Sequence, residues 1–165
     1  IIPEGGANSL GVKGCEDIVT EIQNEVNFDY VSVDCGTGAT LAGMVRKLQS
    51  HQQSIGVQVL KGKDFISDEV VRLNTDSYNN YEVWTDYHFG GYAKYKEDLL
   101  AFMRWFYAHT NIKLDPIYTG KQFYAVFDQL KQGYFPKGAK IVLVHTGGLQ
   151  GIAGFEKRYD VEIYP

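Results

Sequence analysis

The fold is decided by the stretch Phe28-Asp-Tyr-Val-Ser-Val-Asp-Cys-Gly-Thr-Gly-Ala-Thr-Leu-Ala-Gly43. It opens with β-forming residues that stop at Gly36, and helix-compatible residues follow from Leu41 to Leu48. A strand, a tight glycine turn and a helix start direct several unpaired backbone N–H groups at one point, where the helix dipole adds partial positive charge. The stretch therefore predicts an anion site, and a phosphate is the ligand that suits it.

This glycine loop differs from two familiar phosphate-binding loops. No Lys-Ser or Lys-Thr pair follows Gly38, as a Walker loop would require. A dinucleotide fingerprint would place a third glycine where Leu41 stands, with an acidic residue about 20 positions later, and both are missing. Thr37 and Thr40 add hydroxyl donors at the rim of the loop. The alternative interpretation is a β–α turn whose glycines serve geometry alone.

Length and composition describe one globular domain. The chain has 165 residues, 44% of them hydrophobic, and its net charge of −4 lacks the basic excess of a nucleic-acid-binding protein. No apolar run approaches the roughly 20 residues that cross a bilayer, and no signal peptide is visible. Two cysteines, Cys15 and Cys35, make no disulfide framework. We therefore expect a cytoplasmic protein with no nucleic-acid and no membrane partner.

Strand and helix patterns alternate along the chain. This alternation predicts an α/β fold with an open, mostly parallel twisted sheet covered by helices on both faces, in three αβα layers. Strands are expected at 30–35, 54–60, 81–85 and 140–144, the last apolar enough to be central. A strand end is expected at 1–4, and helices at 9–24, 41–48, from 67 onward, 97–108 and 121–132.

Ligands of an open parallel sheet bind beyond the carboxyl ends of its strands. Three loops should converge there, at 35–40, 88–92 and 145–148, and the segment 115–120 is expected to reach the same place. Together they bring a phosphate cradle, exposed tyrosines, and threonines beside glycines. Metal-spaced His/Cys clusters, carboxylate pairs and a Ser-His-Asp order are not evident, so no metal site is predicted.

Four motifs in order carry a family resemblance: Ile2-Pro-Glu-Gly-Gly, Cys35-Gly-Thr-Gly-Ala-Thr-Leu-Ala-Gly-Met44, Asp115-Pro-Ile-Tyr-Thr-Gly-Lys121 and His145-Thr-Gly-Gly148. Together they resemble the C-terminal half of the 1-aminocyclopropane-1-carboxylate (ACC) deaminase and D-cysteine desulfhydrase family. These are pyridoxal 5′-phosphate (PLP) enzymes of the tryptophan-synthase-β type, fold type II. The resemblance covers the whole chain, 1–165, as a single α/β unit. It implies that an N-terminal half is missing, and the start at Ile1 instead of Met points the same way.

One departure from the family matters most. The family lysine that forms the Schiff base with the cofactor lies in the N-terminal half and has no counterpart here. Lys121 stands at a predicted helix start, where a solvated first-turn residue is expected. The resemblance thus implies a fragment with cofactor contacts but no covalent anchor, inactive alone. It also implies that the complete protein is a homodimer acting on a small amino acid.

The resemblance assigns roles to nine residues. Tyr118 matches the family's active-site tyrosine, near the substrate amine or its leaving side, and Tyr92 matches a second family tyrosine, with ordinary aromatic packing as the alternative. Thr119 and Thr146 are candidates for contact with the pyridine nitrogen and its surroundings. Backbone N–H and hydroxyl donors for the 5′-phosphate would come from Gly36, Thr37, Gly38, Ala39 and Thr40.

The two threonines also favour one reaction over another. In the ACC deaminases a glutamate follows the active-site tyrosine and a leucine follows the histidine of the glycine motif. Thr119 and Thr146 stand there in this chain, as in the D-cysteine desulfhydrases. A carboxylate keeps the pyridine nitrogen protonated, whereas a hydroxyl leaves it largely neutral, and a neutral ring suffices to expel a thiolate.

The expected function is therefore β-elimination from D-cysteine, or a similar β-substituted D-amino acid, giving pyruvate, ammonia and sulfide. One alternative is ACC deamination to 2-oxobutanoate and ammonia. The other is a non-enzymatic α/β module that binds a phosphate-bearing ligand.

Overall fold

The computed structural model describes residues 2–165 and contains one parallel four-stranded sheet. Its strands are β1 (Tyr30–Cys35), β2 (Gln53–Gln58), β3 (Tyr81–Trp84) and β4 (Ile141–Leu143), in the spatial order β3-β2-β1-β4. Each neighbouring pair is parallel. Parallel strands need crossovers, and helices supply them.

Six α-helices connect and cover the strands: α1 (Ser9–Glu25), α2 (Ala39–Met44), α3 (Ile66–Leu73), α4 (Glu97–Thr110), α5 (Thr119–Lys131) and α6 (Ile152–Tyr159). Four single 3₁₀ turns lie at η1 (Glu4–Gly6), η2 (Val45–Lys47), η3 (Asp86–His88) and η4 (Leu149–Gly151). Within residues 2–165, no helix has the length and apolarity needed to cross a bilayer.

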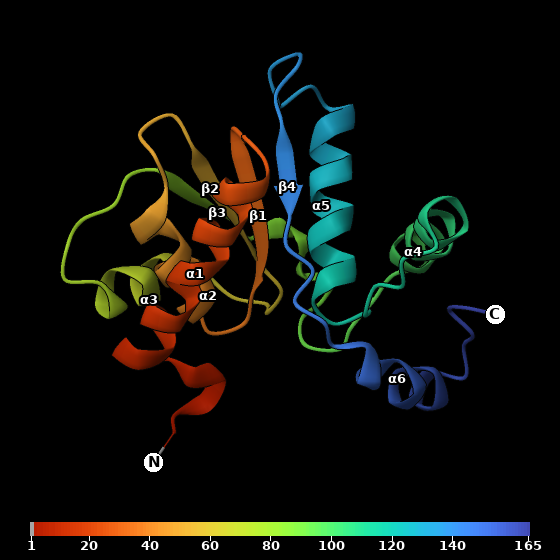
Figure 1. Ribbon diagram of the computed structural model, residues 1–165. Helices are drawn as coiled ribbons and strands as arrows, with labels where there is room; N and C mark the ends of the chain where they lie inside the picture. The colour runs from red at the N-terminus through yellow and green to blue at the C-terminus, as the bar shows by residue number, and fades with distance from the viewer. Residues whose placement is uncertain (1) are drawn as a thin grey trace.

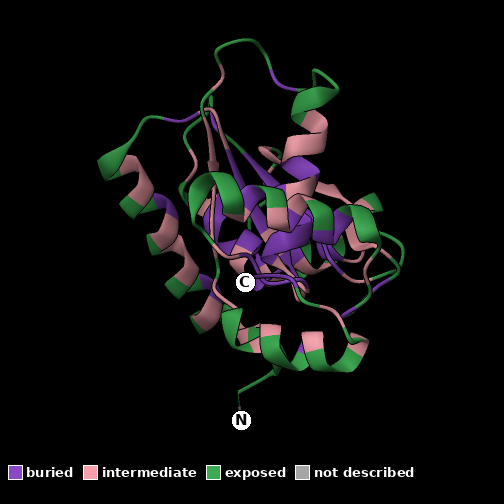
Figure 2. Cartoon of the chain, turned by 90° about the vertical axis from the view of Figure 1, so that its right-hand side faces the viewer, coloured by how far each residue is buried: buried purple, intermediate pink, exposed green. Residues whose placement is uncertain are grey.

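Helices pack on both faces of the sheet, which confirms the predicted three-layer α/β fold (Figure 1). On one face, buried residues of α1, α2 and α3 pack against β1. On the other, Ile55 and Val57 of β2 meet Ala125 and Val126 of α5. A third cluster joins α4, α5 and α6 beyond that layer. Figure 2 shows the buried residues gathered between these elements and the exposed ones on the outer helix surfaces.

The first helix begins where the sequence predicts. The side chain of Asn8 accepts hydrogen bonds from the backbone N–H groups of Leu10 and Gly11, which are otherwise unpaired at a helix start. The helix then crosses α2 at very short range. A Cβ atom added to Gly43 would lie 2.3 Å from the carbonyl oxygen of Val12 and 2.6 Å from the Cβ of Cys15. This contact holds α2, and the loop before it, against the first helix.

Several expectations differ from the structure. The strand 140–144 was predicted to be central, but β4 is one of the two outer strands of this sheet. Ile2 and Pro3 are not in a strand and lead into η1, while residue 1 lies outside the described residues. The helix after the glycine loop is short and tightens into η2. No helix was predicted at α6, where Gly151 directly precedes the helix and Gly154 lies within it.

Candidate active site

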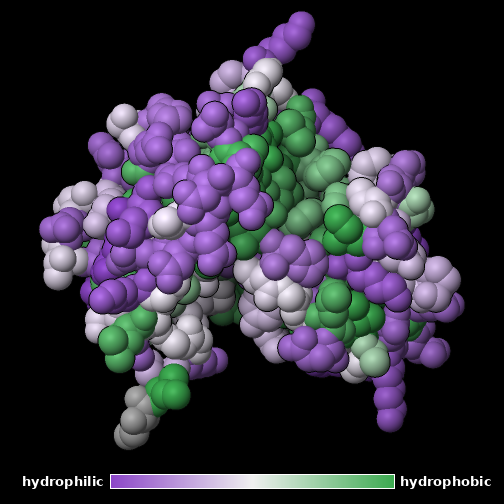
Figure 3. Space-filling model, in the orientation of Figure 1, coloured by the Kyte–Doolittle hydropathy of each residue, from purple (hydrophilic) through white to green (hydrophobic). Residues whose placement is uncertain are grey.

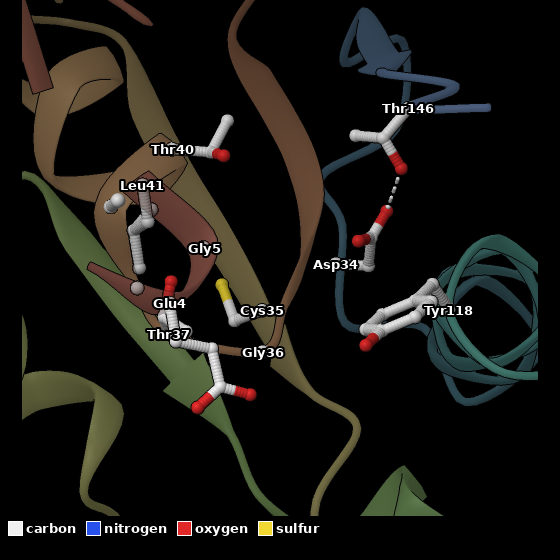
Figure 4. A pocket seen from close by; sticks show the side chains of 12 residues that line it. Glu4, Gly5, Asp34, Cys35, Gly36, Thr37, Thr40, Leu41, Tyr118 and Thr146 are labelled. Carbon is white, nitrogen blue, oxygen red and sulfur yellow. Dashed lines mark hydrogen bonds between the residues drawn. The ribbon is translucent and has the colours of Figure 1, made fainter. Parts of the chain in front are cut away.

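A pocket of about 250 Å³ lies at the carboxyl end of β1. Its wall is formed by residues 34–41, by Glu4 and Gly5 of the N-terminal turn, by Tyr118 at the start of α5, and by Thr146 after β4 (Figure 4). The structure therefore brings together the five residues of the glycine loop, Tyr118 and Thr146, which the sequence places far apart. Asp34 and Glu4 line the same pocket and were not among the predicted site residues.

The glycine loop presents a row of free backbone donors to this pocket. The N–H groups of residues 36–40 donate to no protein acceptor within the described residues. Gly38 adopts the left-handed conformation, with φ of 79°, and its carbonyl accepts the first helical bond from Ala42. Buried or half-buried N–H groups without partners are rare in proteins. A bound anion would satisfy them.

Tyr118 stands between the glycine loop and the other loops of this edge. A Cβ atom added to Gly36 would come within 3.3 Å of its ring, so the absence of a side chain at Gly36 makes room for Tyr118. The rings of Tyr118 and Tyr92 meet edge to face, with centroids 6.3 Å apart. Burial, followed by the nearby Tyr92, raises the pKa of the Tyr118 phenol, which therefore keeps its proton at neutral pH. Tyr92 is 58% exposed, so much of its ring is not covered by packing against the rest of the chain.

Asp115 explains how Tyr118 is held. Its carboxylate accepts hydrogen bonds from the N–H groups of Ile117 and Tyr118, both at 2.8 Å, and from Thr119. These are the unpaired donors at the start of α5. Asp115 is almost fully buried, and the Asp-Pro pair before the predicted helix was a signal that could have identified it as the capping residue.

Thr119 does not line the pocket. Its side chain is fully buried, and its hydroxyl donates to Asp115 at 2.8 Å while accepting from the N–H of Asp115 at 2.9 Å. The expected contact between Thr119 and a pyridine nitrogen is therefore not supported by its position. The Thr119 hydroxyl is instead hydrogen-bonded to Asp115, the residue that caps α5.

Lys121 is also placed differently from the expectation. It was predicted to be solvated, but it is fully buried. Its Nζ donates to the carbonyl oxygens of Val59, His88 and Gly91, and burial lowers the pKa of this amine to about 8. The partners lie 30 or more positions earlier in the chain, and no local pattern could reveal them.

Thr146 is linked directly to Asp34. The Thr146 hydroxyl, in the loop after β4, donates to Oδ1 of Asp34 in β1 at 2.7 Å (Figure 4). Burial is the main cause that raises the pKa of Asp34 to about 6; the Thr146 bond opposes this effect, and the charge of Asp115 adds to it. Asp34 sits inside a β-strand pattern, where nothing in the sequence marks it as a site residue.

Comparison with known proteins identifies the family. Residues 1–147 match the family described as "Pyridoxal-phosphate dependent enzyme". The chain belongs to this family. Its fold type is the one expected from the motifs, and the cofactor of the family is PLP.

Individual relatives narrow the resemblance. A Pyrococcus horikoshii protein named "Putative 1-aminocyclopropane-1-carboxylate deaminase" is 33% identical over 163 residues, covering 92% of this chain and 50% of the relative. D-cysteine desulfhydrase of Klebsiella pneumoniae is 31% identical over 170 residues, covering 94% and 52%. A crystal structure described as an ACC deaminase homologue superposes with a TM-score of 0.79 at 29% identity, covering 96% and 52%. The chain thus spans about half the length of the relatives it matches.

The pocket fits the phosphate end of PLP. Its unpartnered amides, the left-handed Gly38 and the hydroxyl-bearing Thr37 and Thr40 are the donors that a phosphate monoester needs. No lysine within residues 2–165 lines this pocket, and the buried Lys121 is bound to carbonyl groups instead. Among the described residues, no group of three or more His, Cys, Asp or Glu side chains is gathered so that it could hold a metal ion.

Proposed function

We propose that this chain is the cofactor-cradling unit of a PLP-dependent lyase that cleaves D-cysteine, or a similar β-substituted D-amino acid, to pyruvate, ammonia and sulfide. The observation that carries the proposal is the row of unpartnered amides at 36–40 in the same pocket as Tyr118 and Thr146. PLP, when bound, would withdraw electrons from the substrate's Cα and so allow a β-substituent to leave.

The residues of this chain would then have separate tasks. The amides of Gly36, Thr37, Gly38, Ala39 and Thr40, with the two threonine hydroxyls, would hold the 5′-phosphate. Tyr118 would face the substrate, because its phenol lines the pocket and stays protonated, so that its Oη can donate a hydrogen bond to a departing thiolate. Tyr92, packed against Tyr118, would form the wall of the space that the substrate occupies. Thr146 would face the cofactor ring.

The covalent anchor would come from outside this chain. The absence of a lysine from the described pocket wall supports this proposal, as does the twofold length of the relatives. The outer edge of β4 pairs with no strand among residues 2–165, and hydrophobic side chains gather over β4 and α5 (Figure 3). An N-terminal half that covers this face and supplies the lysine would complete the single α/β unit 1–165 into an enzyme.

The proposal also covers the oligomeric state and the cellular location of the complete protein. The complete protein is proposed to be a cytoplasmic homodimer acting on small amino acids. Both cysteines are free thiols in this structure, which is compatible with a reducing compartment. Light scattering of the complete protein would measure the oligomeric state.

The substrate is tested by assaying the complete protein with D-cysteine and with ACC. We expect the higher kcat/KM for D-cysteine, and a loss of turnover in Tyr118→Phe with PLP still bound. A value for ACC equal to or above that for D-cysteine would favour ACC deamination, the alternative that the Pyrococcus horikoshii relative's name supports. A PLP-free protein that binds other phosphate ligands would favour the non-enzymatic module.

A further inference from the structure

Asp34 is a carboxylate within the pocket that the proposed function does not use. It lies at the end of β1, next to the glycine loop, and lines the pocket with Tyr118 and Thr146. In Figure 4 its carboxylate points at the Thr146 hydroxyl and lies beside the Tyr118 ring. Asp34 is half-buried, and the partial loss of water around a carboxylate is costly unless hydrogen bonds or charges compensate. The 2.7 Å bond from Thr146 supplies one such compensation.

The direction of this bond decides what Thr146 can offer to a ligand. A threonine hydroxyl has one proton to donate and two lone pairs that accept. Because the proton is donated to ionised Asp34, only the lone pairs remain for the pocket. A neutral pyridine nitrogen is an acceptor and would meet a second acceptor there. A protonated pyridine nitrogen is a donor and can bond to Thr146.

We propose that Asp34, acting through Thr146, is a positioning residue that keeps the pyridine nitrogen of PLP protonated. This inference rests on the proposed function, which places Thr146 against the cofactor ring. It replaces the expectation that a threonine leaves the nitrogen neutral. Two hydrogen bonds would then be satisfied in series. The pyridine N–H would donate to the Thr146 oxygen, and the Thr146 hydroxyl donates to the Asp34 carboxylate.

The titratable groups that act on Asp34 come from two segments, the start of α5 and the loop after β4. The charge of Asp115, which caps α5, raises the pKa of Asp34, whereas His145, which follows β4, lowers it. His145 accepts from the N–H of Gly147 and its other ring nitrogen contacts the carbonyl of Lys113. With a pKa of about 6, Asp34 is mainly ionised at pH 8 and protonated below pH 5. Below that pH, Thr146 is free to donate.

A protonated ring has a consequence for substrate range. Opening the unactivated cyclopropane of ACC demands a stronger electron sink than expelling a thiolate. Asp34 supplies the carboxylate that the positions of Thr119 and Thr146 lack, so the site combines a desulfhydrase-like threonine pattern with a protonated ring. The complete protein should then turn over ACC as well, at a lower rate than D-cysteine.

The test is nitrogen NMR of the complete protein loaded with PLP that carries ¹⁵N in its ring. At pH 8 we expect the ring nitrogen of the unaltered protein at the protonated position. In Asp34→Asn and in Thr146→Val it should move to the unprotonated position. Asp17→Asn, which removes an exposed carboxylate from α1, is the matched control and should leave it unchanged.

A second measurement needs no cofactor. In the PLP-free complete protein, carbon NMR of the Asp34 carboxyl should show a titration near pH 6, and Thr146→Val should raise that midpoint because it removes a donor to the ionised form.

The outcomes separate this inference from the proposed function. Failure of the unaltered protein to bind PLP overturns both. Normal PLP binding with an unprotonated ring nitrogen, or with a nitrogen whose position is the same in Asp34→Asn, overturns this inference alone. An Asp34 midpoint that Thr146→Val does not move also overturns it. If Asp34→Asn fails to fold, Thr146→Val still decides the question, since Thr146 is exposed in this chain.

Discussion

The Nζ of Lys121 lies 2.7 Å from the carbonyl oxygen of Gly91. It also donates to the carbonyl of His88 at 2.9 Å, so one buried amine on α5 holds the loop that ends at Tyr92. The same helix begins beside Tyr118. Lys121, which does not line the pocket, therefore helps to hold Tyr92 in its edge-to-face contact with Tyr118.

Replacing Lys121 with Met should destabilise the chain and loosen this loop. The carbonyls of Val59, His88 and Gly91 would lose a buried donor, at a cost of about 3 kcal/mol in the free energy of unfolding. Urea unfolding measures the loss, and trypsin should cleave after Lys94 faster. Lys131→Met, at the exposed end of α5, should change stability by less than about 0.5 kcal/mol. Equal effects of the two substitutions would contradict this role.

Asp34 should make stability depend on pH. Its pKa is about 6 in the folded chain against 3.8 for an ordinary aspartate, so the folded state binds more protons between these values. Stability therefore falls as the pH rises from about 4 to about 6 and stays lower above, by at most about 3 kcal/mol for this group.

The measurement compares Asp34→Asn with the unaltered chain by urea unfolding at pH 4.5 and pH 7.5. The difference in free energy of unfolding between the two proteins should shift in favour of the variant at the higher pH. Asp17→Asn should show no such shift. A difference that is the same at both pH values would mean that the Asp34 carboxyl titrates normally.

Gly43 should tolerate no side chain. Gly43→Ala places a Cβ atom 2.3 Å from the Val12 carbonyl oxygen, so α1 and α2 must move apart and disturb the loop before α2. We expect a loss of about 2–3 kcal/mol, as for other overpacked sites. Gly14→Ala lies in the same helix pair with nothing within 4 Å, and should be neutral or stabilising by up to about 1 kcal/mol. Thermal unfolding distinguishes them, and a stable Gly43→Ala would refute the tight crossing.

Local patterns predicted the parts of the fold that depend on neighbouring residues. The sequence predicted a helix at 9–24, and α1 spans Ser9–Glu25. The β-formers before Gly36 gave β1 and its loop. The apolar composition of 140–144 did not reveal that β4 is an outer strand, because the order of strands in a sheet depends on which segments pair.

The candidate site divides in the same way. The glycine loop, Tyr118 and Thr146 could be predicted because their motifs are local, and the structure places them in one pocket. The contact of Thr119 with the pyridine nitrogen stays a prediction, and only the fold shows that its hydroxyl is hydrogen-bonded to Asp115. Asp34 was missed because it lies inside a strand pattern, and its hydrogen-bond partner Thr146 is 112 positions later in the sequence.

The phosphate cradle can be separated from backbone strain by two glycines with similar conformations. Gly38 has φ of +79° in the pocket, and Gly138 has φ of +88° in a turn with nothing near its Cβ position. Alanine at either position incurs a comparable left-handed penalty of about 1–2 kcal/mol. Only Gly38→Ala also disturbs the row of amides. In the complete protein, Gly38→Ala should weaken PLP binding by about 10-fold or more, the effect of losing one charge-assisted hydrogen bond.

Pyridoxal, which lacks the phosphate, is the decisive comparison ligand, because it shares the ring and the aldehyde. Fluorescence titration of the PLP-free complete protein should show that Gly38→Ala loses affinity for PLP while its weaker affinity for pyridoxal hardly changes. Gly138→Ala should bind both ligands as the unaltered protein does. If Gly38→Ala weakened both ligands equally, residues 36–40 would act on the ring or on folding, and the phosphate would have to bind elsewhere.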